Sequence, residues 1–205
     1  MPNAFAAIGF TLRVREERQR FGFSGAYDRV LAPDRNDSAE LTAREADFLT
    51  ERNGIFQATV SETGWPYVQF QGGAPGFLKV IDGQTVGYAD YRGNRQYIST
   101  GNLSHDERVS IIAVDYERQK LWSHASIVED PDVVVFLRDG GHPKAERGIV
   151  IRGAAFDWHC PQHIPIRLTE AERRNEIAPL NARIVMHEVQ LTATAAAEQR
   201  ARVLK

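Results

Sequence analysis

The segment RGNR, residues 92–95, combines residue types that recognise anions. Arg92 and Arg95 supply guanidinium groups, which donate forked hydrogen bonds to phosphate oxygens. Gly93 lets a ligand approach the backbone closely, and Asn94 is a residue type that caps helix N-termini. We therefore predict a phosphate site at this turn, with Asn94 as the cap of the helix that follows. The alternative is an ordinary capped turn with solvated arginines.

Two amide side chains could form the second part of such a site. Gln69 and Gln71 lie two residues apart on a predicted strand, so they share one face of it. Two amides on one face can hydrogen-bond the polar edge of a heteroaromatic ring. The alternative is that both amides face solvent. The glycines that follow do not match G-x-G-x-x-G, and a strand is predicted after them where that motif needs a helix. A dinucleotide-binding loop is therefore not expected.

The segment WHCPQHIPIR, residues 158–167, contains His159, Cys160 and His163 and raises the question of a metal. Zinc needs three or four convergent ligands, and two prolines prevent these residues from lining one face of a regular helix. We predict no metal here but a rigid loop beside a ligand site, with Trp158 and His163 as candidates for its wall. No catalytic motif is recognisable, so no catalytic residue is predicted.

Composition limits the partners of the chain. Its 205 residues carry 25 basic and 27 acidic side chains, a net charge of -2, so no overall field favours nucleic acid or an anionic membrane. One cysteine excludes an internal disulfide framework and is typical of a reducing compartment. No apolar run approaches the roughly 20 residues that span a bilayer. We expect a cytoplasmic protein that binds neither nucleic acid nor membrane.

The elements expected around these residues are mostly hairpins. The segment LTAREADFLTERNG predicts a capped helix from Thr42, with Glu45 three residues later as its capping-box partner. Alternating apolar residues and turn formers then predict strands, with two short helices between them at 131–138 and 169–177. The predicted strands cover residues 55–60, 67–71, the hairpin 76–91, the hairpin 108–130, 147–160 and 182–195. This order indicates an α+β protein, mainly antiparallel β, built around a barrel.

The chain resembles the pyridoxamine 5'-phosphate oxidase-like flavoproteins, particularly the branch called predicted flavin-nucleotide-binding proteins. The similar segments are GIFQATVSETGWPYVQFQGG, GFLKVID, VGYADYRGNRQYISTGN and DYERQKLWSHASIVED. The resemblance implies an FMN-binding split β-barrel with small connecting helices and FMN at a homodimer interface. The resemblance covers roughly residues 40–192. Residues 1–40 are polar and predicted to be irregular, so we expect an N-terminal arm over 1–40, the barrel domain over 41–193 and a C-terminal tail over 194–205.

The resemblance assigns the phosphate end of the site. In the oxidases a Ser-Arg-Lys turn grips the FMN phosphate, and here Asn94, Arg95 and Gln96 stand at the matching positions. Arg95 is thus retained, whereas Gln96 replaces a cation. Lys79 resembles the lysine that ends the preceding strand of the oxidases, and it implies a second phosphate charge.

The resemblance also assigns residues nearer the ring. Ala89 and Asp90 match the strand end that passes the ribityl chain and the ring of FMN. Gln119 resembles the glutamine of an Arg-Gln pair that reaches the flavin from the other subunit. Together with Gln69 and Gln71, these residues complete the predicted cofactor site.

The resemblance weakens at the substrate motifs. Pyridoxamine phosphate oxidases carry Arg-Leu-x-x-Arg and finish in Arg-Leu-x-Pro, whereas this chain has PIRLTEAERR and ends in ARVLK. We therefore expect an FMN-dependent oxidoreductase of another small molecule, with NAD(P)H as a candidate electron donor. The alternatives are a non-catalytic flavin carrier or sensor, or a split barrel that uses haem or a deazaflavin.

Overall fold

The computed structural model describes residues 3–23, 25, 39–114, 118–138, 145–159, 168 and 170–203. The chain divides into two compact units, Met1–His163 and Ile164–Lys205. The first unit contains all the strands of the described residues, and the second contains one long helix. The boundaries predicted at residues 40 and 193 remain predictions.

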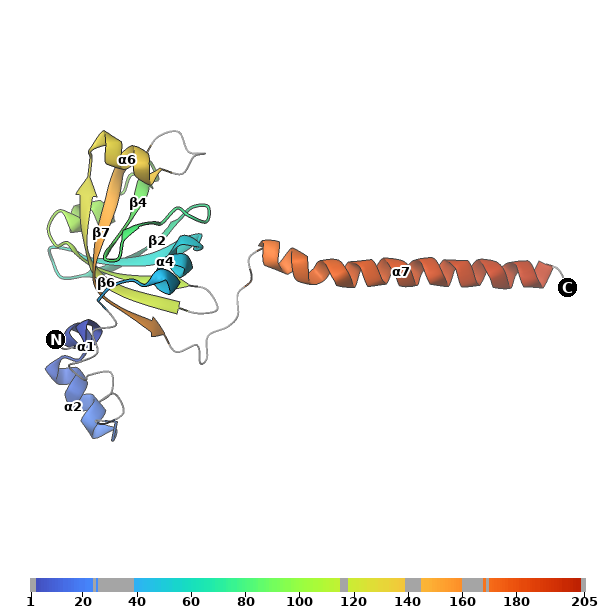
Figure 1. The fold of residues 1–205 in the computed structure, drawn as a ribbon, viewed down its shortest axis with the longest axis horizontal. Coiled ribbons are helices and arrows are strands. Elements are labelled where there is room, and N and C mark those ends of the chain that lie inside the picture. Colours follow the sequence, from blue (N-terminus) through green and yellow to red (C-terminus); the bar gives the residue numbers. More distant parts are fainter. Residues whose placement is uncertain are drawn as a thin grey trace. The chain divides into compact units, whose positions relative to one another are not determined.

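The first unit is built on one antiparallel sheet of seven strands in the order β2-β1-β5-β6-β7-β4-β3 (Figure 1). Every neighbouring pair is antiparallel, which confirms the predicted α+β split-barrel class. The strands are β1 Gly54–Val60, β2 Pro66–Gly72, β3 Lys79–Asp82, β4 Thr85–Tyr91, β5 Arg108–Val114, β6 Arg118–Val128 and β7 Ala145–His159.

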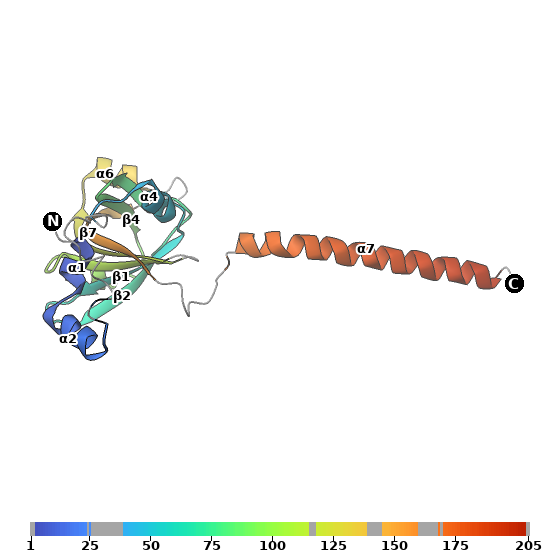
Figure 2. The same ribbon diagram turned by 60° about the horizontal axis from the view of Figure 1, so that its bottom comes forward.

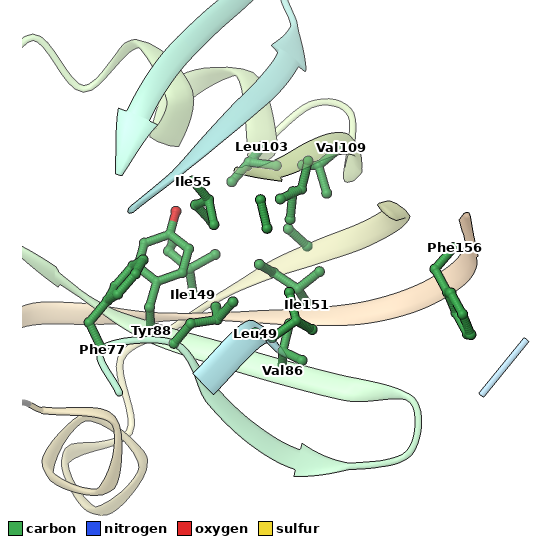
Figure 3. Close-up of a cluster of buried hydrophobic side chains, with 14 residues drawn as sticks. Leu49, Ile55, Phe77, Val86, Tyr88, Leu103, Val109, Ile149, Ile151 and Phe156 are labelled. Atoms are coloured by element: carbon green, nitrogen blue, oxygen red, sulfur yellow. The ribbon is translucent and has the colours of Figure 1, made fainter. Parts of the chain in front are cut away.

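Alternation along the strands builds the core. In β1, Ile55 and Thr59 are fully buried, whereas Phe56 between them is 42% exposed. A cluster of buried apolar side chains from the strands and the segments that connect them fills the interior, and Figure 3 shows the Tyr88 hydroxyl extending from this otherwise apolar group. Any site on the face of β1 and β4 that carries these buried side chains therefore has a packed and rigid floor.

Short helices lie around the sheet, and most of them contact its strands. Their bounds are α1 Ala4–Gly9, α2 Leu12–Arg20, α4 Ala43–Thr50, α5 Ile98–Leu103 and α6 Pro131–Leu137. The predicted capping box of α4 is confirmed, because the Thr42 N–H donates to Glu45 Oε2 at 3.0 Å. Leu137 of α6 packs on β4 and β7 at two glycines, where a Cβ would lie 2.9 Å and 2.7 Å from its methyl carbons. The N-terminal segment, predicted to be irregular, contains α1 and α2 instead.

The second unit corrects one prediction. The strand expected over residues 182–195 is wrong, because these residues belong to helix α7, Glu170–Val203 (Figures 1 and 2). The adjacent Ile184 and Val185 favour a strand locally, but apolar residues also recur three and four positions apart, which is the helical period. The short helix predicted over 169–177 is the beginning of α7. No helix in the described ranges is long and apolar enough to cross a membrane.

Candidate functional site

One pocket collects most of the predicted ligand residues. Its space of about 600 Å³ includes open solvent, and its walls come mainly from β1, β2, β4, α5 and the turn between β4 and α5. Gln69, Gln71 and Asp90 line the strand side, and Asn94, Arg95 and Gln96 line the turn side. Residues far apart in the sequence thus meet around one space.

The two predicted amides share one face of β2. Gln69 and Gln71 are half-buried and line the pocket, whereas Phe70 between them points to the other face and is 58% exposed. The hydroxyl of Ser99 donates to Gln69 Oε1 at 2.7 Å, and this bond ties α5 to the strand. The predicted same-face arrangement is therefore present, with one amide already oriented by a neighbour.

A third amide, Gln57, lies deeper in the pocket and was not predicted. Its side chain is 0% exposed, and its Oε1 accepts a hydrogen bond from the Tyr88 hydroxyl at 3.0 Å. Its Nε2 has no hydrogen-bond partner among the described residues. Buried amide donors are rarely left unpaired, so this atom is suited to an acceptor on a bound ligand or to a water.

The buried position of Gln57 had a signal in the sequence. In GIFQATV the alternation places Gln57 with Ile55 and Thr59 on the buried face, and a glutamine among inward positions is unusual. Burial also raises the pKa of Tyr88, with Asp90 adding to the rise. The phenol therefore stays a neutral donor that holds the Gln57 amide in one orientation.

The turn before α5 is strained. Arg95 and Tyr97 are the described non-glycine residues with positive φ, at 61° and 51°. This left-handed conformation costs a residue roughly 1–2 kcal/mol, and such strain often marks ligand-binding segments. The predicted helix cap at Asn94 is wrong, since α5 begins only at Ile98 after Tyr97. Asn94 Oδ1 instead accepts from the Gln96 N–H at 3.1 Å, which closes a turn within the segment.

The two arginines of the turn have different surroundings. Arg92 Nε lies 3.7 Å from Glu146 Oε1, so its charge is partly balanced. Arg95 is exposed and forms no ion pair with the part of the chain that the structure describes. Arg95, which lines the pocket, is therefore the cation available to an anionic ligand.

The pocket wall also contains an acidic residue, Asp90. Asp90 Oδ2 lies 3.5 Å from Arg147 Nε, while Arg147 Nη2 lies 3.0 Å from Glu146 Oε2. Burial raises the pKa of Asp90, Arg147 opposes this rise, and Glu146 adds to it. The Asp90 carboxyl thus takes up a proton more readily than a free carboxyl.

Three predicted residues lie elsewhere. Ala89 is buried on the face of β4 opposite to Asp90. Lys79 pairs with Gly87, so it shares that opposite face, and neither Lys79 nor Ala89 lines the pocket. Gln119 is in β6, but its side chain lies outside the described part of the structure. Their roles at a flavin remain predictions.

Most of the loop predicted beside the ligand site, after β7, lies outside the described residues. Cys160 and His163 lie outside the described residues. Trp158 is not part of the pocket wall, since its Nε1 donates to Glu45 Oε1 at 2.9 Å and its ring packs on Phe48. Within the described ranges, no three His, Cys, Asp or Glu side chains gather as a metal site would require.

Part of the chain matches a known protein family. The pyridoxamine 5'-phosphate oxidase family model matches residues 41–142, which include β1 to β6 and the turn. No curated protein matches the chain. Among solved structures, HupZ from Group A Streptococcus is 14% identical with a TM-score of 0.49, over 63% of this chain and 99% of that chain.

Two further structures are similar. A putative pyridoxamine 5'-phosphate oxidase from Lactobacillus delbrueckii is 19% identical with a TM-score of 0.46, over 58% of this chain and 94% of that chain. An FMN-binding protein from Syntrophomonas wolfei is 12% identical with a TM-score of 0.45, over 71% of this chain and 97% of that chain.

Proposed function

Because the chain belongs to the pyridoxamine 5'-phosphate oxidase-like family, we propose that its pocket binds FMN and that the protein is an oxidoreductase of a small molecule. One observation carries the proposal. The pocket has an available guanidinium, Arg95, on its turn side and an unpaired buried amide, Gln57, on its strand side. A ligand with an anion at one end and a polar ring at the other satisfies both.

The residues present fit this cofactor. Arg95 would hold the phosphate together with backbone groups of the turn at Gly93 and Asn94. The amides of Gln57 and Gln69 would hydrogen-bond the ring edge, where carbonyl oxygens and ring nitrogens offer acceptors and a donor.

The protein's own contribution is binding and orientation. When bound, FMN would supply the electron transfer, so no dedicated acid or base among the side chains is needed. The Tyr88 hydroxyl fixes the Gln57 amide, and Ser99 fixes the Gln69 amide, so both groups are oriented before a ligand enters. The packed floor beneath them excludes water from one side of the pocket.

A second copy of the chain is part of the proposal. The outer face of β2, β1 and β5 exposes Phe56, Val68, Phe70 and Ile112, with exposed fractions from 37% to 60%. The register pairs Phe56 with both Phe70 and Ile112, so these side chains form one apolar patch. Patches of this kind mark interaction surfaces, and a homodimer would cover it. Replacing Phe70 by Ser should then lower the mass measured by light scattering.

The proposal is tested first by absorption. The purified protein should show the oxidised flavin spectrum or acquire it on titration with FMN. Bleaching on anaerobic addition of NADH or NADPH would support a reductase, while a bound flavin inert to every donor and acceptor would favour a carrier. A colourless protein that ignores FMN, or one that takes up haem or a deazaflavin instead, would contradict the FMN assignment.

A further inference from the structure

Among the described residues of the second unit, helix α7 has no other element to pack against. Its described side chains are all exposed, and its large apolar ones range from 41% exposed at Ile177 to 70% at Leu191. The helix also contains Pro179, which removes a backbone hydrogen bond and destabilises a helix interior. Helices in proteins owe most of their stability to packing of an apolar face, so α7 needs a partner.

The apolar residues of α7 repeat as a heptad. Ile177, Leu180, Ile184 and Leu191 follow one another at spacings of three, four and seven residues, which places them at positions a, d, a and a. His187 occupies the position d between the last two. This 3.5-residue period is the one that keeps a stripe facing a second, supercoiled helix.

The residues on this stripe favour an identical helix. Isoleucine at a with leucine at d selects two-stranded parallel pairing. Beside the stripe, Arg183 stands at position g and Glu188 at the following position e. In a parallel pair, position g of one helix lies next to the following position e of the other helix. Two identical chains would therefore form the Arg183–Glu188 ion pair twice, once on each side of the seam.

We propose that α7 of one copy pairs in parallel and in register with α7 of a second copy, as a two-stranded coiled coil. The seam consists of Ile177, Leu180, Ile184, His187 and Leu191. The polar His187 weakens the seam and disfavours other registers, as single polar residues at core positions do. This pairing does not depend on flavin binding.

Cysteine cross-linking of the full chain tests the proposal directly. In a Cys160→Ser background, Leu180→Cys places two thiols across the seam, whereas Met186→Cys is a matched control on the same exposed helix but off the seam. Mild oxidation should link Leu180→Cys at least about tenfold faster than Met186→Cys, because disulfides need Cα atoms within about 7 Å. Equal rates, or no link at position 180, would overturn parallel pairing.

Two further variants separate the seam from general helix effects. In the Leu180→Cys chain, Ile184→Lys should reduce the cross-linking rate at least about tenfold, because it buries a charge in the seam, and Val185→Lys should not. His187→Leu should increase the rate, because it completes the apolar seam. Equal effects of the two lysines, or no gain from His187→Leu, would contradict the proposed seam.

Discussion

The floor and the rim of the pocket are built in opposite ways. On the floor, Gln57 and Tyr88 are buried at 0% and 2% exposure and joined by a hydrogen bond. On the rim, Arg95 and Tyr97 are exposed and hold left-handed backbone conformations. The floor is part of the folded core, whereas the rim contributes little to it. Changes on the floor should therefore alter stability, and changes on the rim should alter binding alone.

The largest effect is expected at Arg95. Arg95→Ala should weaken FMN binding by about 1.5–3 kcal/mol, the value of a lost charged hydrogen bond, without changing the free energy of unfolding of the ligand-free protein. Riboflavin, which lacks the phosphate, should bind both proteins equally. Arg92→Ala is the matched control, and its effect should be smaller because Arg92 already faces Glu146. Equal losses for the two arginines would contradict the distinction between them.

On the floor, Gln57→Leu should lower the free energy of unfolding by about 1–3 kcal/mol, because it leaves the buried Tyr88 hydroxyl without its acceptor. Adding Tyr88→Phe should restore much of this loss, since both polar partners are then gone. Urea unfolding of the ligand-free proteins measures both changes. A double variant no more stable than Gln57→Leu would show that the bond is not the cause.

Gly93 in the rim and Gly101 in helix α5, outside the pocket wall, offer a matched pair with a smaller effect. A Cβ at Gly93 or Gly101 would meet no heavy atom within 4 Å, so the free protein should tolerate alanine at both. Gly101→Ala, inside α5, should stabilise by about 0.5–1 kcal/mol and leave FMN binding unchanged. Gly93→Ala should weaken FMN binding by about 1 kcal/mol, because its methyl group takes space close to the phosphate. Unchanged affinity would exclude Gly93 from the site.

The smallest effect is a pH dependence at Asp90. Its pKa is raised above 3.8 by burial, against the opposing charge of Arg147 and with the help of Glu146. The folded state therefore binds this proton more tightly, so the contribution of Asp90 to stability is present at low pH and lost as the pH rises through the raised pKa. Asp90→Asn cannot titrate, and its stability relative to the parent should increase from acid to neutral pH. A constant difference in unfolding curves would contradict this.

Much of the floor could be predicted from the sequence, because strand alternation is a local property. Gln69 and Gln71 share a face simply because they are two residues apart. The unpaired Nε2 of Gln57 could not be predicted. It depends on the Tyr88 hydroxyl, on another strand, donating its hydrogen bond to the oxygen of this amide. Alternation predicts the face of the sheet on which a side chain lies, but not the residue with which it forms a hydrogen bond.

The rim and helix α7 show the limits of local rules. Asn94 suits a helix cap, but α5 begins four residues later, and the left-handed Tyr97 decides where the helix starts. Residues 182–195 look like a strand because β-branched residues are frequent there, yet the longer period over α7 is helical. Local propensity was overridden in both places by a wider context.

The central claim is that the rim holds a phosphate and the floor holds a ring. Titration of the unmodified protein with FMN and with riboflavin, under identical salt, tests it most directly. The account predicts that FMN binds at least about tenfold more tightly than riboflavin, since charge-assisted hydrogen bonds to the phosphate contribute more than 1.4 kcal/mol. Equal affinities for the two flavins, or binding of neither, would contradict it.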